Sequence, residues 1–175
     1  MQESSSLDIL KQKLLDCKAV KFGNFTLTSG KKSKFYVDMK LASTDPAILG
    51  LIAKEFSKHI SAEVDFIAGM ELGAVPLAVA LSLETGLPYS MIRKSARDHG
   101  TASRIEGPSE GKALLVDDVA TTGGSNIESI KSLIDENVEV LQVMVVVDRE
   151  EGAAEKIAPF NLDYISLIKI SDLVD

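Results

Sequence analysis

The fold of this chain is decided by one stretch of sequence, Ala113-Leu-Leu-Val-Asp-Asp-Val-Ala-Thr-Thr-Gly-Gly-Ser-Asn126. Its first four residues are apolar and predict a short strand buried in a parallel sheet. Two adjacent carboxylates, Asp117 and Asp118, follow this strand, and a run of threonine, glycine and serine comes next. Apolar side chains at helical spacing then predict an amphipathic helix over 125–135. Together these are the parts of a phosphate site, in which backbone N–H groups and the positive end of the helix dipole bind the anion.

The acidic pair has two interpretations. In an ordinary strand-to-helix turn, Asp117 and Asp118 would help to cap the next helix, and for the two residues alone this interpretation is favoured. The whole string favours a different site, in which the carboxylates bind a ribose diol or a hydrated Mg²⁺, because two adjacent acids with nothing nearby to cap are hard to explain structurally. The string is not a Walker A motif, since no Gly-Lys-Ser/Thr follows the glycines.

Length and composition limit the class of protein. A chain of 175 residues fits one domain, and 45% hydrophobic with 26% charged residues is ordinary for a globular protein. No apolar run approaches the roughly 18 residues of a membrane span, and the polar first residues lack the pattern of a secretion signal. The single Cys17 excludes an intrachain disulfide and suits a reducing compartment. We therefore expect a cytoplasmic protein with no membrane partner, and the net charge of −7 argues against nucleic acid as the main partner.

Most of the chain alternates between predicted strands and helices. After a first helix carrying Leu7, Leu10, Leu14 and Leu15, strands are predicted over 20–28, 35–39, 66–68, 89–92, 113–116, 138–147 and 162–167, and helices over 46–59, 75–83, 125–135 and 150–157. This alternation implies an α/β fold with a central, mainly parallel sheet flanked by helices. Ligands bind at the carboxyl ends of the strands in such sheets. Four residues follow predicted strands at that edge: Gly69, Arg93, Asp117 and Arg149.

The segment 95–111 is anomalous because it is a long polar stretch between two predicted strands. It carries Arg97, His99 and Arg104, and Arg93 and Lys94 directly precede it. A loop of this length inside a compact domain is usually functional or disordered. Its composition suits a mobile catalytic loop over about 95–110 that closes on an anion, and the alternative is a solvated basic surface.

The string 113–126 resembles the phosphoribosyl pyrophosphate (PRPP) signature of type I phosphoribosyltransferases. The resemblance implies that family's fold as a single domain over 1–175, with a small N-terminal hood formed mainly by about 1–40. In the family the two acids hold the ribose hydroxyls and the small-residue loop holds the 5′-phosphate, while the start of the helix at 75 suggests a pyrophosphate site. The expected PRPP-binding residues are Leu72, Gly73, Ala74, Arg93, Lys94, Arg97, His99, Asp117, Asp118, Val119, Ala120, Thr121, Thr122, Gly123, Gly124 and Ser125.

Three further strings, over 21–38, 93–100 and 147–152, resemble the hood, the catalytic loop and the arginine-bearing segment of orotate phosphoribosyltransferases. The resemblance implies that a turn presents backbone N–H groups to the edge of orotate, that an aromatic ring covers its face, and that an arginine pairs with its oxygens. The orotate-binding residues expected on this basis are Ser29, Gly30, Lys31, Phe35, Tyr36, Thr121 and Arg149.

The orotate contacts have structural alternatives. Phe35 and Tyr36 would also suit the packing of a hairpin, about as well as base contact. Arg149 would also suit a surface ion pair with Glu150 or Glu151, because isolated surface pairs are common.

The resemblance implies transfer of the phosphoribosyl group from PRPP to orotate, which gives orotidine 5′-monophosphate and pyrophosphate in de novo UMP biosynthesis. By analogy with glycosyl transfer, the transition state resembles an oxocarbenium ion. Negative charge then develops on the leaving pyrophosphate, where Mg²⁺, Arg93, Lys94 and Arg97 stabilise it. His99 donates a hydrogen bond or a proton to the same group.

Asp117 and Asp118 complete the expected catalytic set. We expect substrate oxygens and water to hold most of the Mg²⁺ shell, so no dedicated protein cage is required and the two carboxylates reach the ion through water or the ribose. The resemblance also implies a homodimer whose active sites are shared across the interface. Two alternatives remain: the same chemistry on a purine, and a PRPP-binding regulator that binds RNA or DNA.

Overall fold

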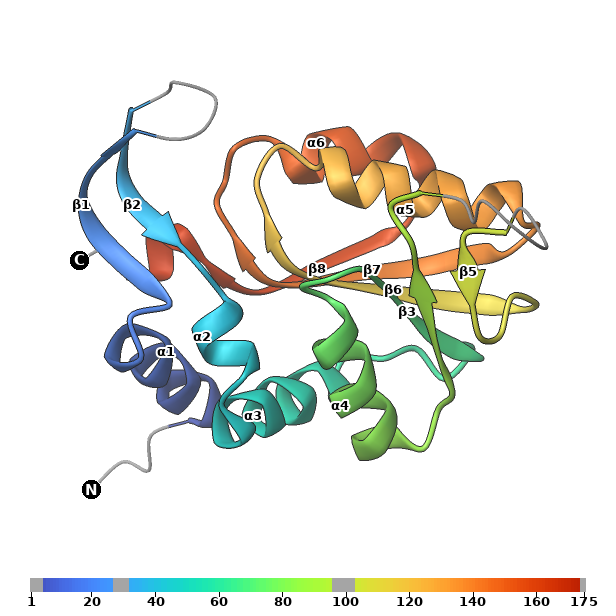
Figure 1. The fold of residues 1–175 in the computed structure, drawn as a ribbon, viewed down its shortest axis with the longest axis horizontal. Coiled ribbons are helices and arrows are strands. Elements are labelled where there is room, and N and C mark those ends of the chain that lie inside the picture. Colours follow the sequence, from blue (N-terminus) through green and yellow to red (C-terminus); the bar gives the residue numbers. More distant parts are fainter. Residues whose placement is uncertain (1–4, 27–31, 96–102, 174–175) are drawn as a thin grey trace.

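The computed structural model describes residues 5–26, 32–95 and 103–173. It contains a six-stranded sheet and a two-stranded sheet (Figure 1). The strands are β1 (Val20–Thr26), β2 (Lys32–Val37), β3 (Phe66–Met70), β4 (Tyr89–Ile92), β5 (Ile105–Glu106), β6 (Lys112–Ala120), β7 (Glu139–Asp148) and β8 (Asp163–Lys169). The α-helices are α1 (Ser6–Asp16), α2 (Lys40–Ser43), α3 (Pro46–Ser57), α4 (Val75–Thr85), α5 (Gly124–Asp135) and α6 (Ala153–Ile157), with 3₁₀ turns η1 (Ala158–Phe160) and η2 (Ile170–Leu173).

The six-stranded sheet has the order β5-β4-β3-β6-β7-β8. Its neighbouring strands are parallel except for β5, which runs antiparallel to β4, so the mainly parallel sheet expected from the sequence is confirmed. The chain passes outward from β3 to β4, then returns to β6 on the other side of β3 and continues through β7 to β8. The direction of winding therefore reverses between β3 and β6. Open α/β sheets bind ligands at the carboxyl ends of the strands beside such a reversal.

Helices cover both faces of this sheet, with α3 and α4 on one side and α5 and α6 on the other (Figure 1). Successive residues of a strand point to opposite faces. In β3, Ile67 packs with α1, α3 and α4, whereas Phe66 belongs to the cluster formed with α5 and α6. In β6, Leu114 and Leu115 divide between the two clusters in the same way. Burial on both faces explains why these strands are continuous apolar runs rather than alternating ones.

The structure corrects one strand boundary that matters for the site. The sequence predicted that the strand starting at Ala113 ends before the acidic pair, but β6 continues to Ala120. Pairing with β7 keeps residues 117–120 in the strand, since Asp117 lies opposite Val145 and Ala120 lies opposite Asp148. Asp117 and Asp118 are therefore part of a strand, and their backbone is fixed by the sheet.

Two further boundaries differ for local reasons. The polar segment predicted over 95–111 includes β5, which pairs with β4 through Ile105. The helix predicted from Glu150 begins at Ala153, because Glu150 and Gly152 both have positive φ, at 57° and 98°, which a helix cannot contain. The remaining predicted elements are present, with ends that differ by a few residues.

The strands β1 and β2 form an antiparallel hairpin with an irregular register between Phe22 and Phe25. The hairpin curves away from the central sheet and stands beyond its carboxyl edge (Figure 1). It begins beside α1 and leads directly into α2 through Asp38 and Met39. Among the described residues, no helix is both long enough and apolar enough to cross a membrane.

Candidate active site

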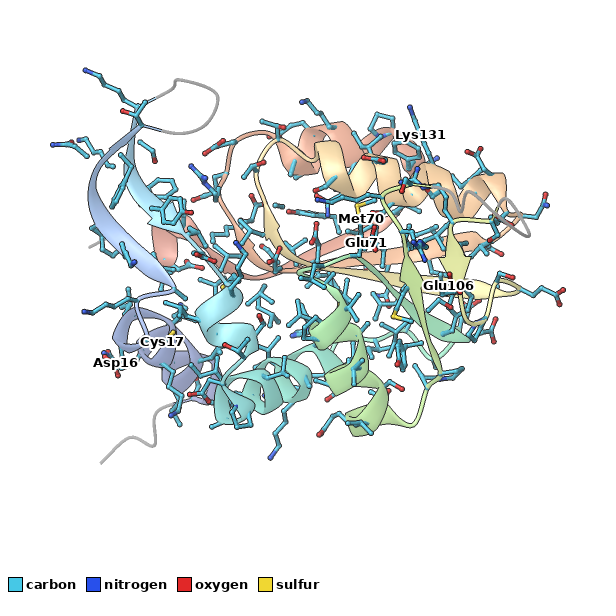
Figure 2. The ribbon with its side chains drawn as sticks, viewed as in Figure 1. Asp16, Cys17, Met70, Glu71, Glu106 and Lys131 are labelled. Atoms are coloured by element: carbon cyan, nitrogen blue, oxygen red, sulfur yellow. The ribbon has the colours of Figure 1, made fainter. Side chains whose placement is uncertain are left out.

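A cleft of about 300 Å³ opens at the carboxyl ends of β3 and β6, where the winding of the sheet reverses. Met70, the last residue of β3, and Glu71, which follows it, lie near the middle of the molecule (Figure 2). The residues that line the cleft include Lys40, Glu71, Gly73, Lys94, Asp117 and Asp118. The structure thus brings together the acidic pair, the loop after β3 and Lys94 after β4. Of the four residues that the strand pattern placed at this edge, Asp117 lines the cleft.

The acidic pair is half-buried and held by its own backbone. The N–H of Asp118 donates to Asp117 Oδ1 at 2.9 Å, and the N–H of Val119 donates to Asp118 Oδ1 at 2.8 Å. Burial, followed by repulsion from the neighbouring Asp118, raises the pKa of Asp117 to about 7. Burial also raises the pKa of Asp118. Two carboxyl groups that disfavour their own ionisation in a cleft mark a candidate functional site rather than a stabilising contact.

The turn after the acidic pair leaves the start of α5 without a side-chain cap. Gly123, at the N-cap, has φ 75°, and no described side chain accepts a hydrogen bond at this position. A Cβ on Gly123 would also lie 3.1 Å from Ala153 Cα, so both conformation and space favour glycine. Asp117 accepts from the side chains of Ser125 and Asn126 and does not cap the backbone of α5. The capping interpretation therefore fails, and the first N–H groups of α5 face a position suited to an anion.

The loop after β3 approaches the acidic pair closely. A Cβ on Gly73 would lie 2.6 Å from Asp118 Oδ2, so this position admits only glycine without a shift. The peptide bond between Glu71 and Leu72 is cis. No side chain among the described residues caps α4, which starts one residue after Ala74. The Ala74 N–H already donates to Met70 O at 3.3 Å, which leaves Leu72 and Gly73 as the better candidates of the three predicted donors.

The residues after β4 are fixed by contacts that sequence reasoning did not assign to the site. The guanidinium of Arg104 donates to Arg93 O at 2.8 Å and to Lys94 O at 2.7 Å, and it also donates to Glu128 on α5 at 2.8 Å. The N–H of Lys94 donates to Glu71 Oε1 at 2.8 Å. Arg104 therefore joins the two ends of the segment 95–103 and holds the backbone that carries Arg93 and Lys94.

Arg149 follows β7 and is only 8% exposed. Its Nη2 lies 2.7 Å from Glu151 Oε1, with the geometry of an ion pair rather than a hydrogen bond, and its Nε and Nη2 have no hydrogen-bond partner among the described residues. Its Cζ lies 5.0 Å from the ring centroid of Phe35. The ion pair with Glu151 is present, but a buried guanidinium with unpaired N–H groups also has capacity for an anionic ligand.

The predicted aromatic pair divides between two environments. Phe35 faces Arg149, whereas Tyr36 packs with Phe25 at a ring-centroid distance of 5.7 Å and remains 41% exposed. Alternate residues of β2 point to opposite sides of the hairpin, which explains the division. Phe35 is therefore the better placed of the two for contact with a ligand bound by Arg149.

Several predicted site residues lie outside the described part of the chain. They are Ser29, Gly30 and Lys31 in the turn of the hairpin, and Arg97 and His99 in the segment after β4. Conversely, Lys40 lines the cleft and Asn126 donates to Asp117, although neither residue was predicted. Lys40 comes next to the hairpin segment in sequence, while Asn126 ends the 113–126 string, so its position was the only available signal.

A second cavity of about 380 Å³ lies at the carboxyl ends of β7 and β8, lined in part by Asp148, Glu155 and Tyr164. The Asp148 carboxylate accepts from the Tyr164 O–H at 2.9 Å and from the Glu150 N–H at 2.7 Å. These internal bonds already satisfy the most buried carboxylate of the cavity. We therefore place the active site in the smaller cleft, which combines the acidic pair with two uncapped helix ends.

Comparisons with known proteins identify the family of the chain. Residues 44–170 match the phosphoribosyl transferase domain family. An orotate phosphoribosyltransferase of Pyrococcus abyssi is 48% identical over 168 residues, which cover 93% of this chain and 92% of that protein. One of Methanosarcina mazei is 47% identical over 161 residues, covering 90% of this chain and 86% of that protein.

A solved structure gives the same result for the fold. The crystal structure of Mycobacterium tuberculosis H37Rv orotate phosphoribosyltransferase in complex with Fe(III) dicitrate has a TM-score of 0.84 and 32% identity, and the match covers 98% of this chain and 100% of that chain. The chain therefore belongs to the phosphoribosyltransferase family, and within it to the orotate phosphoribosyltransferases.

Proposed function

We propose that this protein transfers the 5-phosphoribosyl group of PRPP to a ring nitrogen of orotate, giving orotidine 5′-monophosphate and pyrophosphate on the route to UMP. The observation that carries the proposal is the half-buried pair Asp117–Asp118 in the cleft at the reversal of the sheet. The pair stands between two helix ends without side-chain caps among the described residues. This arrangement offers anion sites on either side of a diol-binding centre, which matches the order of groups in PRPP.

PRPP binds in this proposal with its ribose hydroxyls on Asp117 and Asp118. Its 5′-phosphate occupies the turn from Val119 to Ser125, where the N–H groups at the start of α5 point towards the anion. Its pyrophosphate lies along the loop at Leu72 and Gly73. The close approach of Gly73 to Asp118 supports this placement, because a ligand held by both loops would span a short distance.

Orotate binds in this proposal between the hairpin and the end of β7. Its carboxylate and ring oxygens accept from the N–H groups of Arg149 that have no hydrogen-bond partner among the described residues, and the planar guanidinium suits paired acceptors. Phe35, already against that guanidinium, covers one face of the base. Thr121 and the turn residues Ser29, Gly30 and Lys31 complete the proposed contacts.

Mg²⁺ is the proposed cofactor. Carboxylate oxygens of Asp117 and Asp118 in an open cleft suit the oxygen ligands that this ion prefers, and substrate phosphates and water would supply the rest of its shell. When bound, the ion neutralises charge on the pyrophosphate. Within the described residues, no group of three or more histidine, cysteine or acidic side chains is arranged to hold a metal.

The proposed chemical step breaks the bond between the ribose anomeric carbon and pyrophosphate through an oxocarbenium-like transition state. Lys94 lines the cleft and places positive charge there. Arg93, Arg97 and His99 join it in this proposal when the catalytic loop closes. Closure also excludes water, which would otherwise compete with orotate for the anomeric carbon.

The direct test is the loss of orotate absorbance on adding enzyme, PRPP and Mg²⁺, with adenine, hypoxanthine and uracil as parallel acceptors. We expect turnover of orotate alone, and its loss on addition of EDTA. Turnover of a purine instead would show that the acceptor assignment is wrong while the PRPP site is right. If no base reacts although PRPP binds, the protein is better explained as a PRPP-dependent regulator, and a salt-sensitive gel shift with RNA or DNA would test that function.

We also propose that the chain acts as one domain in the cytoplasm and as a homodimer that shares its two active sites. The hood about 1–40 and the catalytic loop about 95–110 then serve sites in different subunits. If so, Arg97→Ala in the catalytic loop mixed with Asp118→Asn will recover part of the wild-type rate, because each heterodimer contains one site free of both substitutions. Recovery should follow subunit exchange verified by native mass spectrometry. Two inactive variants that stay inactive after exchange would contradict shared sites.

A further inference from the structure

Asn126 is the third residue of α5 and is 1% exposed. Its Nδ2 donates to Asp117 Oδ2 at 2.9 Å. Its Oδ1 is buried and has no hydrogen-bond partner among the described residues. The side chain therefore makes one strong polar contact, and this contact is with the acidic pair.

Asn126 makes the shorter of the two hydrogen bonds to Asp117 Oδ2. The neighbouring Ser125 Oγ lies 3.4 Å from the same Oδ2, which makes a weak bond at best. The other oxygen, Oδ1, accepts from the Asp118 N–H. Donors thus hold both oxygens of Asp117, so the carboxylate plane cannot rotate freely. Each oxygen still has lone-pair capacity to accept a further hydrogen bond from a ligand in the cleft.

Stability alone does not explain an asparagine at this position. A buried acceptor without a partner destabilises the folded state, and asparagine is a weak helix former. Nearby serines on α5 show how the helix normally satisfies buried polar groups: Ser129 and Ser132 donate to the carbonyls of Ser125 and Glu128, one turn earlier. Asn126 departs from this pattern and directs its donor across to β6 instead.

We infer that Asn126 is a positioning residue for PRPP binding, which holds the Asp117 carboxylate in the orientation that accepts the ribose hydroxyls. The inference rests on the proposed function of Asp117. Asn126 acts through Asp117 and does not line the cleft itself. Its position ties the start of the phosphate-binding helix to the ribose-binding strand, so that both parts of the PRPP site keep a constant spacing.

The test compares Asn126→Ala and Asn126→Leu with the control Ser132→Ala, which removes a buried hydroxyl bonded only to its own helix. Isothermal titration calorimetry gives the PRPP dissociation constant, initial rates give the separate KM values for PRPP and orotate, and thermal unfolding gives stability. Loss of a hydrogen bond to a charged group predicts PRPP affinity about tenfold weaker or more in both Asn126 variants. In the Asn126 variants, the KM for orotate should stay within about twofold of wild type. In Ser132→Ala, the PRPP affinity should stay within the same range.

The leucine variant separates positioning from packing. If Asn126 only fills space, leucine restores the PRPP affinity that alanine loses, and the inference is wrong. It is equally wrong if the KM values for both substrates rise together in proportion to lost stability. If leucine does not fit, the alanine variant decides through the KM split: weaker PRPP affinity with an unchanged KM for orotate supports positioning, and an unchanged PRPP dissociation constant refutes it. Failure of the wild-type protein to turn over orotate would instead refute the proposed function, so the two failures are distinguishable.

Discussion

Asp117→Asn will lower PRPP-dependent turnover by about 100-fold and, in the free protein at pH 8, raise the melting temperature. The loss follows because the variant removes a charged acceptor for the ribose hydroxyls, and charged hydrogen bonds contribute on the order of 1.5–3 kcal/mol each. The gain follows because the native carboxylate is poorly solvated and lies beside the charge of Asp118. An amide at 117 can still bond with Asn126, whose own amide needs only to rotate so that its oxygen accepts.

The sign of the stability change follows from proton binding. Asp117 has a pKa of about 7 in the folded protein, against an ordinary value of 3.8. The folded state therefore binds more protons than the unfolded state between these values, and the free energy of unfolding falls as the pH rises from about 4 to about 7. The full difference corresponds to on the order of 4 kcal/mol. Because Asp117 keeps some solvent contact, we expect about half of this free energy to appear as added stability of Asp117→Asn. This corresponds to a rise of roughly 4–8 °C in its melting temperature.

The measurement is calorimetric unfolding of the wild type and Asp117→Asn from pH 5 to pH 8, together with turnover at saturating substrates. The variant should gain stability relative to wild type across this range and reach its full advantage near pH 8. Asp135→Asn is a matched control, since that carboxylate is exposed at the end of α5 and should change neither property. A variant that is destabilised at pH 8 would contradict the desolvation of Asp117.

Arg149→Ala will raise the KM for orotate by about 100-fold, while PRPP affinity changes little. Removing one partner of a buried charged contact typically costs 2–5 kcal/mol, part of which is the unpaired charge left on the ligand. Phe35 loses its cation contact as well, although that contribution is smaller. Steady-state rates with each substrate varied in turn, and calorimetric titration of PRPP, separate the two effects.

Glu151→Gln is the control that distinguishes a ligand-binding arginine from a structural ion pair. It replaces the carboxylate that lies 2.7 Å from Arg149 with a neutral amide and leaves the guanidinium in place. If Arg149 serves orotate, Glu151→Gln keeps the KM for orotate near or below the wild-type value, because a competing carboxylate charge is gone. If the ion pair is the purpose of Arg149, the two variants will have similar, mainly thermal effects, and the assignment of orotate to this end of β7 fails.

Local pattern was sufficient for most of the elements and for the acidic pair and glycine turn on which the proposed PRPP site rests. The positive φ at Gly123 and the apolar spacing of α5 are local features, so the string 113–126 already indicated the turn and the helix start. The end of β6 was misjudged because charged residues disfavour a buried strand on their own. Pairing with β7 outweighs that preference over Asp117 to Ala120.

The sequence alone determined the class of fold and the family, because apolar periodicity, the acidic pair and the glycine turn act over short range. Tertiary structure alone decided which groups meet. Gly73 and Asp118 come into contact because the sheet places β3 beside β6, and Phe35 reaches Arg149 only through the hairpin that stands over β7. The raised pKa of Asp117 and the bond from Asn126 likewise require burial and a long-range contact. Neither property belongs to a residue by itself, because solvent exclusion and hydrogen-bond geometry depend on the packed neighbours.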